Sequence, residues 1–521
     1  MNNNRSLFLA SFLTLIAAGT GFAIRGAILG DWASQFGFTK VDLGTITGGG
    51  LTGFGIVILV ASLFADKTGY KSVLLLAFVL HILSAVVTLS ATPIFGLYGK
   101  TATYWFLFVG MFMFAVANGL CEAVINPLVA TLYPNQKTHY LNILHAGWPG
   151  GLIVGGILGF FVCGPKSWLF QLRWEIPMAF FLIPTLIYGM IVFKERFPIS
   201  EAKAAGVEFT TMLKEFAAPV FLLLLLLHAM VGYVELGTDS WITNIMNNVL
   251  EINPILLFIY TAAIMFVLRF FAGPIVEKIN PVGLLFVSSV LGCLGLFWLG
   301  TASAGFAILA AATVYGVGKT FFWPTMLGVV GERFPKGGAI TMGAVGGFGA
   351  LSAGLLGGPG IGYKQDYYAS QNLQDNVQAT YTRYVAEEQN SFLVFPAISG
   401  LDGAKVGVLE DRGEDLIKRV KSLKSAGQAL SDDRELEKLS TWWNSAKQFA
   451  DEDEKPIKEA SIFGGRMALK WTAVVPLMMA LGYLFLILYF RAKGGYQQEV
   501  LHGAQPEGEH YTGGVEGPIE P

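Results

Sequence analysis

Polar side chains recur at helical spacing inside long apolar runs of this chain. Asn118, Glu122 and Asn126 lie four residues apart, and each such step advances about 40° around a helix, so we expect one polar stripe. A carboxyl group in an apolar run is costly, which makes it a functional candidate. The stripe predicts a cavity-facing site with Glu122 coupling a proton and both amides binding substrate. The alternative is a permanently paired structural carboxylate.

Three other runs carry groups that suit a polar solute. His228, Gly232, Glu235 and Asp239 share one helical face, and Glu235 is the second candidate for proton coupling. Amide, imidazole and indole groups can bond sugar hydroxyls or stack on a sugar ring. Such groups, together with the ammonium group of Lys319, supply the remaining substrate-binding candidates, which are Asn142, His145, Trp148, Lys319 and Trp323.

One charged residue lies in the first apolar run and another lies at its end. Arg25 is deep enough to require a partner and is a charge-pair candidate, while Asp31 lies near the end of the run. Gly318-Lys319-Thr320 ends like a phosphate-binding loop, but Thr313 stands where that motif needs glycine, so we reject it.

Composition requires a membrane setting for these groups. Of 521 residues, 53% are hydrophobic and 14% are charged, too few charges to cover a soluble core of this size. A net charge of −2 gives no indication of nucleic-acid binding. Cys121, Cys163 and Cys293 lie within or at the end of apolar runs, so neither a disulfide scaffold nor a metal site is expected. We therefore predict an all-α polytopic membrane protein without a cofactor.

Twelve apolar runs are long enough to cross a bilayer. They cover residues 6–30, 43–65, 72–93, 104–130, 139–163, 174–194, 215–239, 253–276, 281–302, 304–330, 338–361 and 469–491. With the N-terminus inside, short inner segments hold 13 basic residues and short outer loops hold 4. This bias predicts that both termini are cytoplasmic, in a cytoplasmic (inner) or plasma membrane.

The two sets of six spans repeat one another weakly. The loop residues Asp66 and Glu277 are offset by 211, and the pairs Asn126-Pro127 and Trp323-Pro324 are offset by 197. The second offset relates Glu122 to Lys319, so these groups could face one cavity, paired directly or through substrate. Such repeats are typical of transporters with two pseudo-symmetric halves.

Specific motifs resemble a known family. The run Asp66-Lys67-Thr68-Gly69-Tyr70-Lys71 resembles the loop 2–3 signature of the major facilitator superfamily, and 273–280, with Glu277 and Lys278, is a degenerate copy. The stretches 122–127, 141–148, 233–241 and 322–325 look like the fucose:proton symporter branch. The resemblance implies the major facilitator fold, a monomer, an acidic proton-coupling residue at Glu122 and another late in span 1, where Asp31 is the nearest match.

The loop signature has a physical role of its own. Asp66 lies at a span boundary, where a carboxylate can meet the N-terminus of an adjacent helix. We expect Asp66, Lys67, Gly69 and Lys71 to form a gating contact, with Glu277 and Lys278 in the second half. The alternative is plain topology, namely basic residues in a cytoplasmic loop.

Charge also divides the chain into regions. Residues 362–465 hold 31 of the 72 charged residues and form a polar non-cytoplasmic insertion, in which 409–447 predicts a short helical hairpin. It is either a solvated loop or a lid or partner-docking module. The expected regions are a bundle at 1–194, a linker at 195–214, spans 7–11 at 215–361, the insertion, span 12 at 466–493 and a disordered tail at 494–521.

The sequence thus predicts a secondary active transporter that moves a small polar solute by alternating access. The resemblance makes the solute a monosaccharide carried with a proton, through a lipid bilayer and without nucleic acid. A uniporter, a sodium-coupled carrier, a drug:proton exporter and a transporter-like sensor remain open. An enzyme is not expected, because no metal cluster or nucleophile–base pair has recognisable spacing.

Overall fold

The structure is a computed structural model that describes residues 3–38, 40–163, 167–247, 255–302, 305–425, 429–499 and 501. Eleven of its helices are long and apolar enough to cross a membrane, and the shorter apolar helix α13 (Ile255–Arg269) occupies the position of the predicted eighth span. The twelve-span prediction is therefore consistent with the described part of the chain.

The first half is built from long helices joined by short connections. Its elements are α1 (Asn3–Ala27), α2 (Leu29–Phe36), α3 (Lys40–Thr68), α4 (Tyr70–Leu89), α5 (Ala91–Leu132), α6 (Lys137–Val162), α7 (Glu175–Ala179) and α8 (Leu182–Lys194). Gly69 makes the turn between α3 and α4 with φ 83°, a left-handed conformation that glycine adopts without strain. Gly99, with φ 74°, kinks α5.

The second half repeats this arrangement with more interrupted helices. Its elements are α11 (Pro219–Gly232), η2 (Tyr233–Gly237), α12 (Thr238–Asn247), α13, α14 (Ala272–Thr301), α15 (Gly305–Lys319), α16 (Phe322–Arg333), α17 (Gly338–Ser352), η4 (Ala353–Gly357), α18 (Gly358–Asn376), α23 (Ala450–Thr472) and α24 (Val474–Ala492). The segments η2 and η4 are π-helical turns, a form that often marks functional positions.

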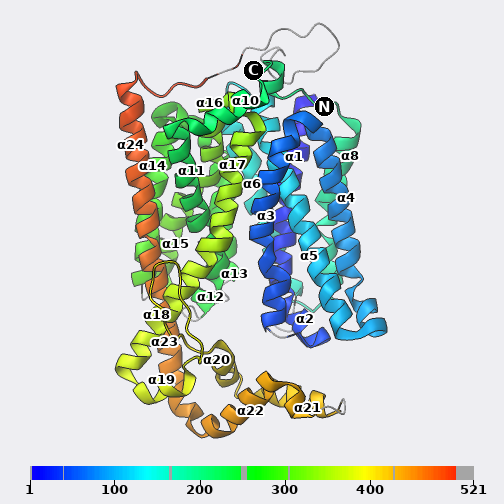
Figure 1. The fold of residues 1–521 in the computed structure, drawn as a ribbon, viewed down its shortest axis with the longest axis vertical. Coiled ribbons are helices and arrows are strands. Elements are labelled where there is room, and N and C mark those ends of the chain that lie inside the picture. The colour runs from blue at the N-terminus through cyan, green and yellow to red at the C-terminus, as the bar shows by residue number, and fades with distance from the viewer. Residues whose placement is uncertain are drawn as a thin grey trace.

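The two halves stand side by side (Figure 1). The described chain begins at the end of the bundle that also carries the α3–α4 turn and the last residues of α24. We call this end of the bundle the terminal end. The other end carries the insertion, and we call it the insertion end.

Glycine faces bring helices together in two different ways. Gly151 and Gly155 of α6 contact the backbone of α1 within the first half. Gly343 and Gly347 of α17 instead contact α3, across the two halves. These glycine faces of α6 and α17 are thus close-contact surfaces, with different partners.

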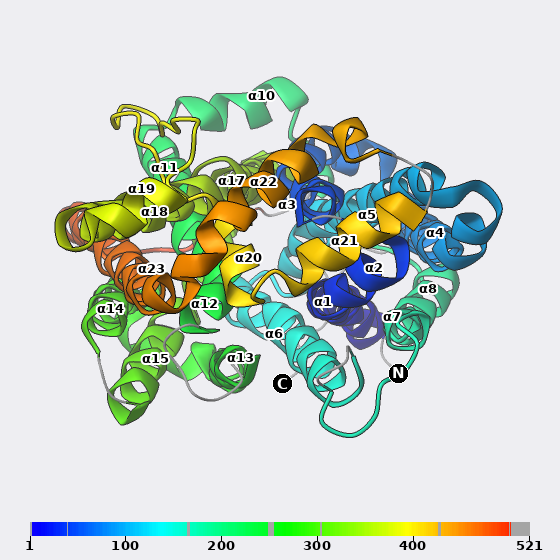
Figure 2. The ribbon, with the colours of Figure 1, turned by 90° about the horizontal axis from the view of Figure 1, so that it is seen from below.

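The insertion is a packed unit and not a simple loop. It contains the far ends of α18 and α23 together with α19 (Gln378–Tyr384), α20 (Gly403–Glu410), α21 (Glu414–Ser425), η5 (Leu430–Asp432), α22 (Arg434–Ala446) and η6 (Lys447–Phe449). Its own apolar core includes Leu373, Tyr384 and Trp443. Figure 2 shows α20, α21 and α22 lying across the insertion end of the bundle.

Two helices run across the predicted limits of the insertion. α18 continues past residue 362 and α23 begins before residue 465, and the two helices pack against each other. The two helices predicted within 409–447 are present as α21 and α22.

The linker and the tail both lie at the terminal end. The linker forms α9 (Glu201–Ala204), α10 (Phe209–Lys214) and η1 (Glu215–Ala217). The tail was expected to be disordered from residue 494, but the Tyr496 hydroxyl donates to Glu332 Oε2 at 2.6 Å and the ring packs on Phe490. Residues 502–521 lie outside the described part of the chain.

Candidate substrate and proton site between the two halves

Glu122 lies in a buried polar cluster where α5 meets the second half. Its Oε1 accepts hydrogen bonds from Trp323 Nε1 of α16 at 3.0 Å and from Asn126 Nδ2 at 3.1 Å. Asn126 Oδ1 in turn contacts His145 Nε2 of α6 at 2.9 Å, and that nitrogen lies 3.7 Å from Glu122 Oε1. The structure therefore joins four of the predicted site residues directly.

Arg269, at the end of α13, is the centre of the cluster in the second half. Its Nη2 donates to Glu235 Oε1 of η2 at 3.1 Å, and both side chains are buried. Its Nη1 donates to the backbone carbonyl of His145 at 2.6 Å, and its Nε to that of Thr320 at 2.7 Å. One guanidinium thus connects α6 of the first half with η2 and the α15–α16 turn of the second half.

Two prolines explain why these carbonyl groups need an outside donor. A helical carbonyl at position i normally accepts from the N–H at i+4, and proline has no N–H. Pro149 and Pro324 stand four residues after His145 and Thr320. Arg269 therefore supplies hydrogen bonds that the helices cannot make themselves, which is the buried-group satisfaction that an apolar interior demands.

Lys319 does not pair with Glu122. Its Nζ forms an ion pair with Asp239 Oδ1 of α12 at 2.5 Å, inside the second half. The Lys319 side chain is 1% exposed and that of Asp239 14%, so Asp239 is more enclosed than a solvated residue at a span end. The repeat offset relates Glu122 to Lys319 in the sequence, but it does not show which carboxylate lies nearer to the lysine.

Some buried polar atoms of the cluster have no hydrogen-bond partner among the described residues. They are Glu235 Oε2 and both ring nitrogens of His228. The His228 ring lies 4.6 Å from the Trp323 ring, so it borders the same cluster as Glu122. Free acceptor and donor positions beside two carboxyl groups are what a polar solute or an exchanging proton would use.

The predicted polar stripe splits into two directions. Asn118 Oδ1 contacts His81 Nε2 of α4 at 2.9 Å, within the first half, whereas Asn126 faces His145. Two steps of four residues turn a helix by about 80°, which is enough to separate the ends of the stripe. Asn142 joins the halves one layer nearer the terminal end, because its Nδ2 donates to Thr325 Oγ1 at 3.1 Å.

Three predicted residues lie apart from the cluster. Asp31 lies in α2 at the insertion end, where it accepts from Gln171 Nε2 at 2.9 Å. Trp148 packs against Phe22, with 5.6 Å between ring centroids. Arg25 forms no ion pair within the described residues. Its guanidinium lies 3.4 Å from the centre of the Phe114 ring, a cation–π contact, and its Nη2 donates to Ser84 Oγ at 3.4 Å.

The terminal end carries the predicted gating residues. Asp66 Oδ2 accepts from the backbone N–H of Ala339, at the start of α17 in the other half, at 3.0 Å. A carboxylate at a helix N-terminus is the contact expected from the loop signature. Lys71 Nζ donates to the carbonyls of Phe193 and Glu195, whereas Lys67, Glu277 and Lys278 are exposed.

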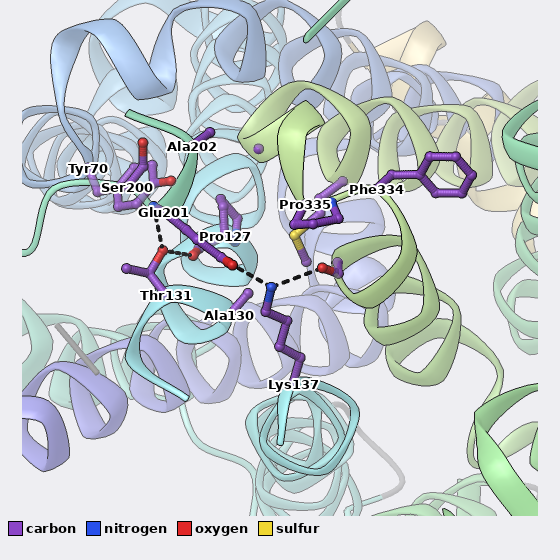
Figure 3. A pocket seen from close by; sticks show the side chains of 13 residues that line it. Tyr70, Pro127, Ala130, Thr131, Lys137, Ser200, Glu201, Ala202, Phe334 and Pro335 are labelled. Carbon is purple, nitrogen blue, oxygen red and sulfur yellow. Dashed lines mark hydrogen bonds and ion pairs between the residues drawn. The ribbon is translucent and has the colours of Figure 1, made fainter. Parts of the chain in front are cut away.

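A small cavity of about 20 Å³ lies beside this contact, with room for about one water molecule. Figure 3 shows Lys137 reaching from α6 to the linker residue Glu201. Its Nζ also donates to the carbonyl of Gly331. The two distances are 2.6 and 3.0 Å, and both side chains of the ion pair are buried. The linker is thereby tied to both halves.

The tail crosses the same region. Besides Tyr496, Glu499 bonds through its backbone N–H to the Glu332 carbonyl at 2.8 Å. The Gln498 side chain donates to the carbonyl of Pro134 in the first half. Glu332 itself caps α6 in the first half, accepting from the Thr138 N–H at 3.1 Å. Contacts at the terminal end therefore hold the halves together.

The described residues contain no group of three or more His, Cys, Asp or Glu side chains arranged to hold a metal ion. Sequence reasoning missed Arg269, although it lies inside the predicted span 253–276 and a charge in a span is a signal. It also missed the Lys137–Glu201 pair, for which the linker offered no pattern.

Comparisons with known proteins agree with this architecture. A family model described as Major Facilitator Superfamily matches residues 7–358. The Major Facilitator Superfamily transporter FucP in its outward conformation is similar with a TM-score of 0.56 and 17% identity, over 70% of this chain and 92% of that one. The proton:xylose symporter XylE is similar with a TM-score of 0.57 and 16% identity, over 71% of this chain and 90% of that one.

A third similar structure covers more of the chain. It is a bacterial homolog of the human lysosomal transporter Spinster, inward-facing and unoccupied, with a TM-score of 0.59 and 14% identity over 93% of this chain and 97% of that one. No curated protein matches by sequence. At these identities the structures support the fold, and the family match covers more than half of the residues. The chain belongs to the Major Facilitator Superfamily.

Proposed function

We propose that this protein is a secondary active transporter that carries a small polar solute, first of all a monosaccharide, together with a proton. The observation that carries the proposal is the pair of buried carboxyl groups in one cluster. Glu122 comes from the first half and Glu235 from the second, and Trp323, His145 and Arg269 link them across the interface. Two such groups can exchange protons when the halves move relative to each other.

The proposed transport cycle uses the contacts at the terminal end as its gate. Opening this end would break the Asp66–Ala339 and Glu332–Thr138 contacts, each of which joins a carboxylate to a helix N-terminus of the other half. Such contacts are strong enough to hold a state and weak enough to break during transport. In this proposal the terminal end is the cytoplasmic end, as the charge bias predicts.

The direct test is flux into vesicles. Purified protein in liposomes is offered labelled monosaccharides with and without an inward proton gradient, while internal pH is recorded. Accumulation of a sugar with matching proton entry is the expected result. Equilibration that does not depend on the gradient would indicate uniport in place of symport. Dependence on a sodium gradient would indicate that sodium is the coupling ion.

Glu122→Gln tests the coupling role. We expect gradient-driven accumulation to fall at least tenfold while exchange of labelled for unlabelled solute persists, because glutamine keeps an acceptor for Trp323 but cannot carry the proton. Asp375→Asn, an exposed carboxylate of α18, is the matched control and should transport normally. Accumulation in the Glu122→Gln protein equal to that control would remove Glu122 from the mechanism.

Asp66→Asn tests the gate. Losing the charge at the start of α17 should cost about 1 kcal/mol and shift the population of the closed terminal end about fivefold. Spin labels at the exposed positions Thr68 and Lys336 would report this as a longer distance component. Glu277→Gln, the exposed repeat equivalent of Asp66, should leave the distances unchanged. Equal distance distributions in both variants would refute the gate.

A further inference from the structure

An irregular hairpin in the insertion carries four apolar residues in a row, and three of them are exposed. The antiparallel bridge between Asn390 and Ile398 closes it, with backbone hydrogen bonds of 2.8 and 2.9 Å. The tip between them contains Phe392, Leu393, Val394 and Phe395. Leu393 is 70% exposed, Val394 94% and Phe395 53%. Apolar exposure of this kind in one short segment marks an interaction site.

The tip differs in charge from the rest of the insertion. Residues 362–465 hold 31 charged side chains, yet the stretch 389–401 holds none. A tip that served only to join two solvated segments would be polar, as turns usually are. Its composition instead fits a surface without water.

The tip is held beside the membrane-spanning part of α18. The Phe392 ring lies against Gly360, where an added Cβ would be 2.9 Å from the ring edge. The Tyr363 hydroxyl donates to the Pro396 carbonyl at 2.9 Å, and its ring lies 5.8 Å from that of Phe395. Gly360 falls within the predicted span 338–361. The hairpin therefore turns back toward the bilayer while the rest of the insertion points away.

Both views of the fold agree on this placement. The hairpin that joins α19 to α20 lies beside α18 in Figure 1, and Figure 2 places it at the outer edge of the bundle near α11. Around the bundle, that edge is where lipid would be.

Aromatic side chains nearby mark the boundary of the bilayer. α18 carries three tyrosines close together, Tyr363, Tyr367 and Tyr368. On α23, the side chain of Phe463 is 39% exposed and that of Trp471 is 48% exposed. Tyrosine and tryptophan gather where a membrane meets water. The hairpin tip is thus level with the interface, on the outside of the helices.

We propose that Leu393, Val394 and Phe395 insert into the bilayer boundary at the insertion end and anchor the insertion to the membrane. The partner is the lipid surface, because the tip adjoins a membrane span and carries no charge for a polar partner. Transfer of such apolar side chains from water into an apolar environment is favourable, which holds the hairpin in place. This inference is independent of the transported solute.

A nitroxide label at Val394→Cys tests the anchor in phosphatidylcholine vesicles. The background variant has Cys121, Cys163 and Cys293 replaced by alanine, and Ser425→Cys, exposed on α21, is the matched control. Because Val394 is almost fully exposed, the label should not disturb folding. We expect the label at 394 to collide with oxygen at least threefold more than with a water-soluble nickel chelate, and the label at 425 to show the reverse.

Two outcomes would overturn the proposal. Equal preference of both labels for the nickel chelate would place the tip in water. Protection of position 394 from both reagents would mean that protein, from a second copy or a partner, covers the tip in place of lipid.

Discussion

Arg269→Met is expected to abolish transport and to lower the free energy of unfolding by about 3–5 kcal/mol, the cost of breaking a buried ion pair. The variant removes the partner of Glu235 and also the donors to the carbonyls of His145 and Thr320. Those carbonyls have no other helical donor because of Pro149 and Pro324, so they would stay unsatisfied in an apolar interior.

Two companion variants separate charge from geometry. Arg269→Lys keeps the charge, but one ammonium group cannot reach three acceptors in different directions, so transport should remain low. Arg269→Met combined with Glu235→Gln removes the uncompensated carboxylate, and we expect part of the lost stability to return without transport. Thermal unfolding in detergent and vesicle uptake measure the two effects.

Arg173→Met is the control for removing an arginine as such. Arg173 pairs with Glu175 at 2.9 Å, but its side chain is 73% exposed, so its loss should cost at most about 1 kcal/mol. If Arg269→Met were as stable and as active as Arg173→Met, the central role assigned to Arg269 would be refuted.

The membrane architecture could be predicted because its cause is local. A run of about 20 apolar residues is a span wherever it occurs, and the offset of 211 between Asp66 and Glu277 needs only the sequence. The contact of Asp66 with a helix N-terminus could also be predicted, because a carboxylate at a span boundary is stabilised by the N-terminus of a neighbouring helix.

Partner choice within the cluster could not be predicted in this way. Lys319 had Glu122 and Asp239 as possible partners, and only the positions of α12 and α15 decide for Asp239. Arg269 was overlooked because its role depends on two prolines in other spans, whose free carbonyls point to it only once the helices are assembled. The same holds for the insertion, since periodicity predicts α21 and α22 but not the extension of α18 and α23.

Gly232→Ala is expected to cost at least about 3 kcal/mol of stability, because α11 and α17 meet there backbone to backbone. An alanine Cβ at this position would lie 1.8 Å from the carbonyl oxygen of Gly349, a separation that no rotamer change can relieve. The helices would have to move apart. Thermal unfolding in detergent measures the loss.

The first half supplies a matched control. Gly26→Ala places a methyl group where nothing lies within 4 Å, so this variant should be neutral or gain up to about 1 kcal/mol from the better helix propensity of alanine. Gly237, related to Gly26 by the repeat offset of 211, is the intermediate case, since its Cβ would lie 2.9 Å from Gly357 Cα. Similar melting of all three variants would contradict the backbone contact.

The contact between Gly232 and Gly349 also affects the proposed transport site. Gly232 and Gly349 precede the π-helical turns η2 and η4, and η2 carries Glu235. His228 lies against Gly349, and the Tyr315 hydroxyl donates to the Val234 carbonyl at 2.9 Å. Separating α11 from α17 would therefore displace Glu235 relative to Arg269. We expect any Gly232→Ala protein that survives purification to bind solute weakly and to lose proton-driven accumulation, whereas the Gly26→Ala protein keeps both.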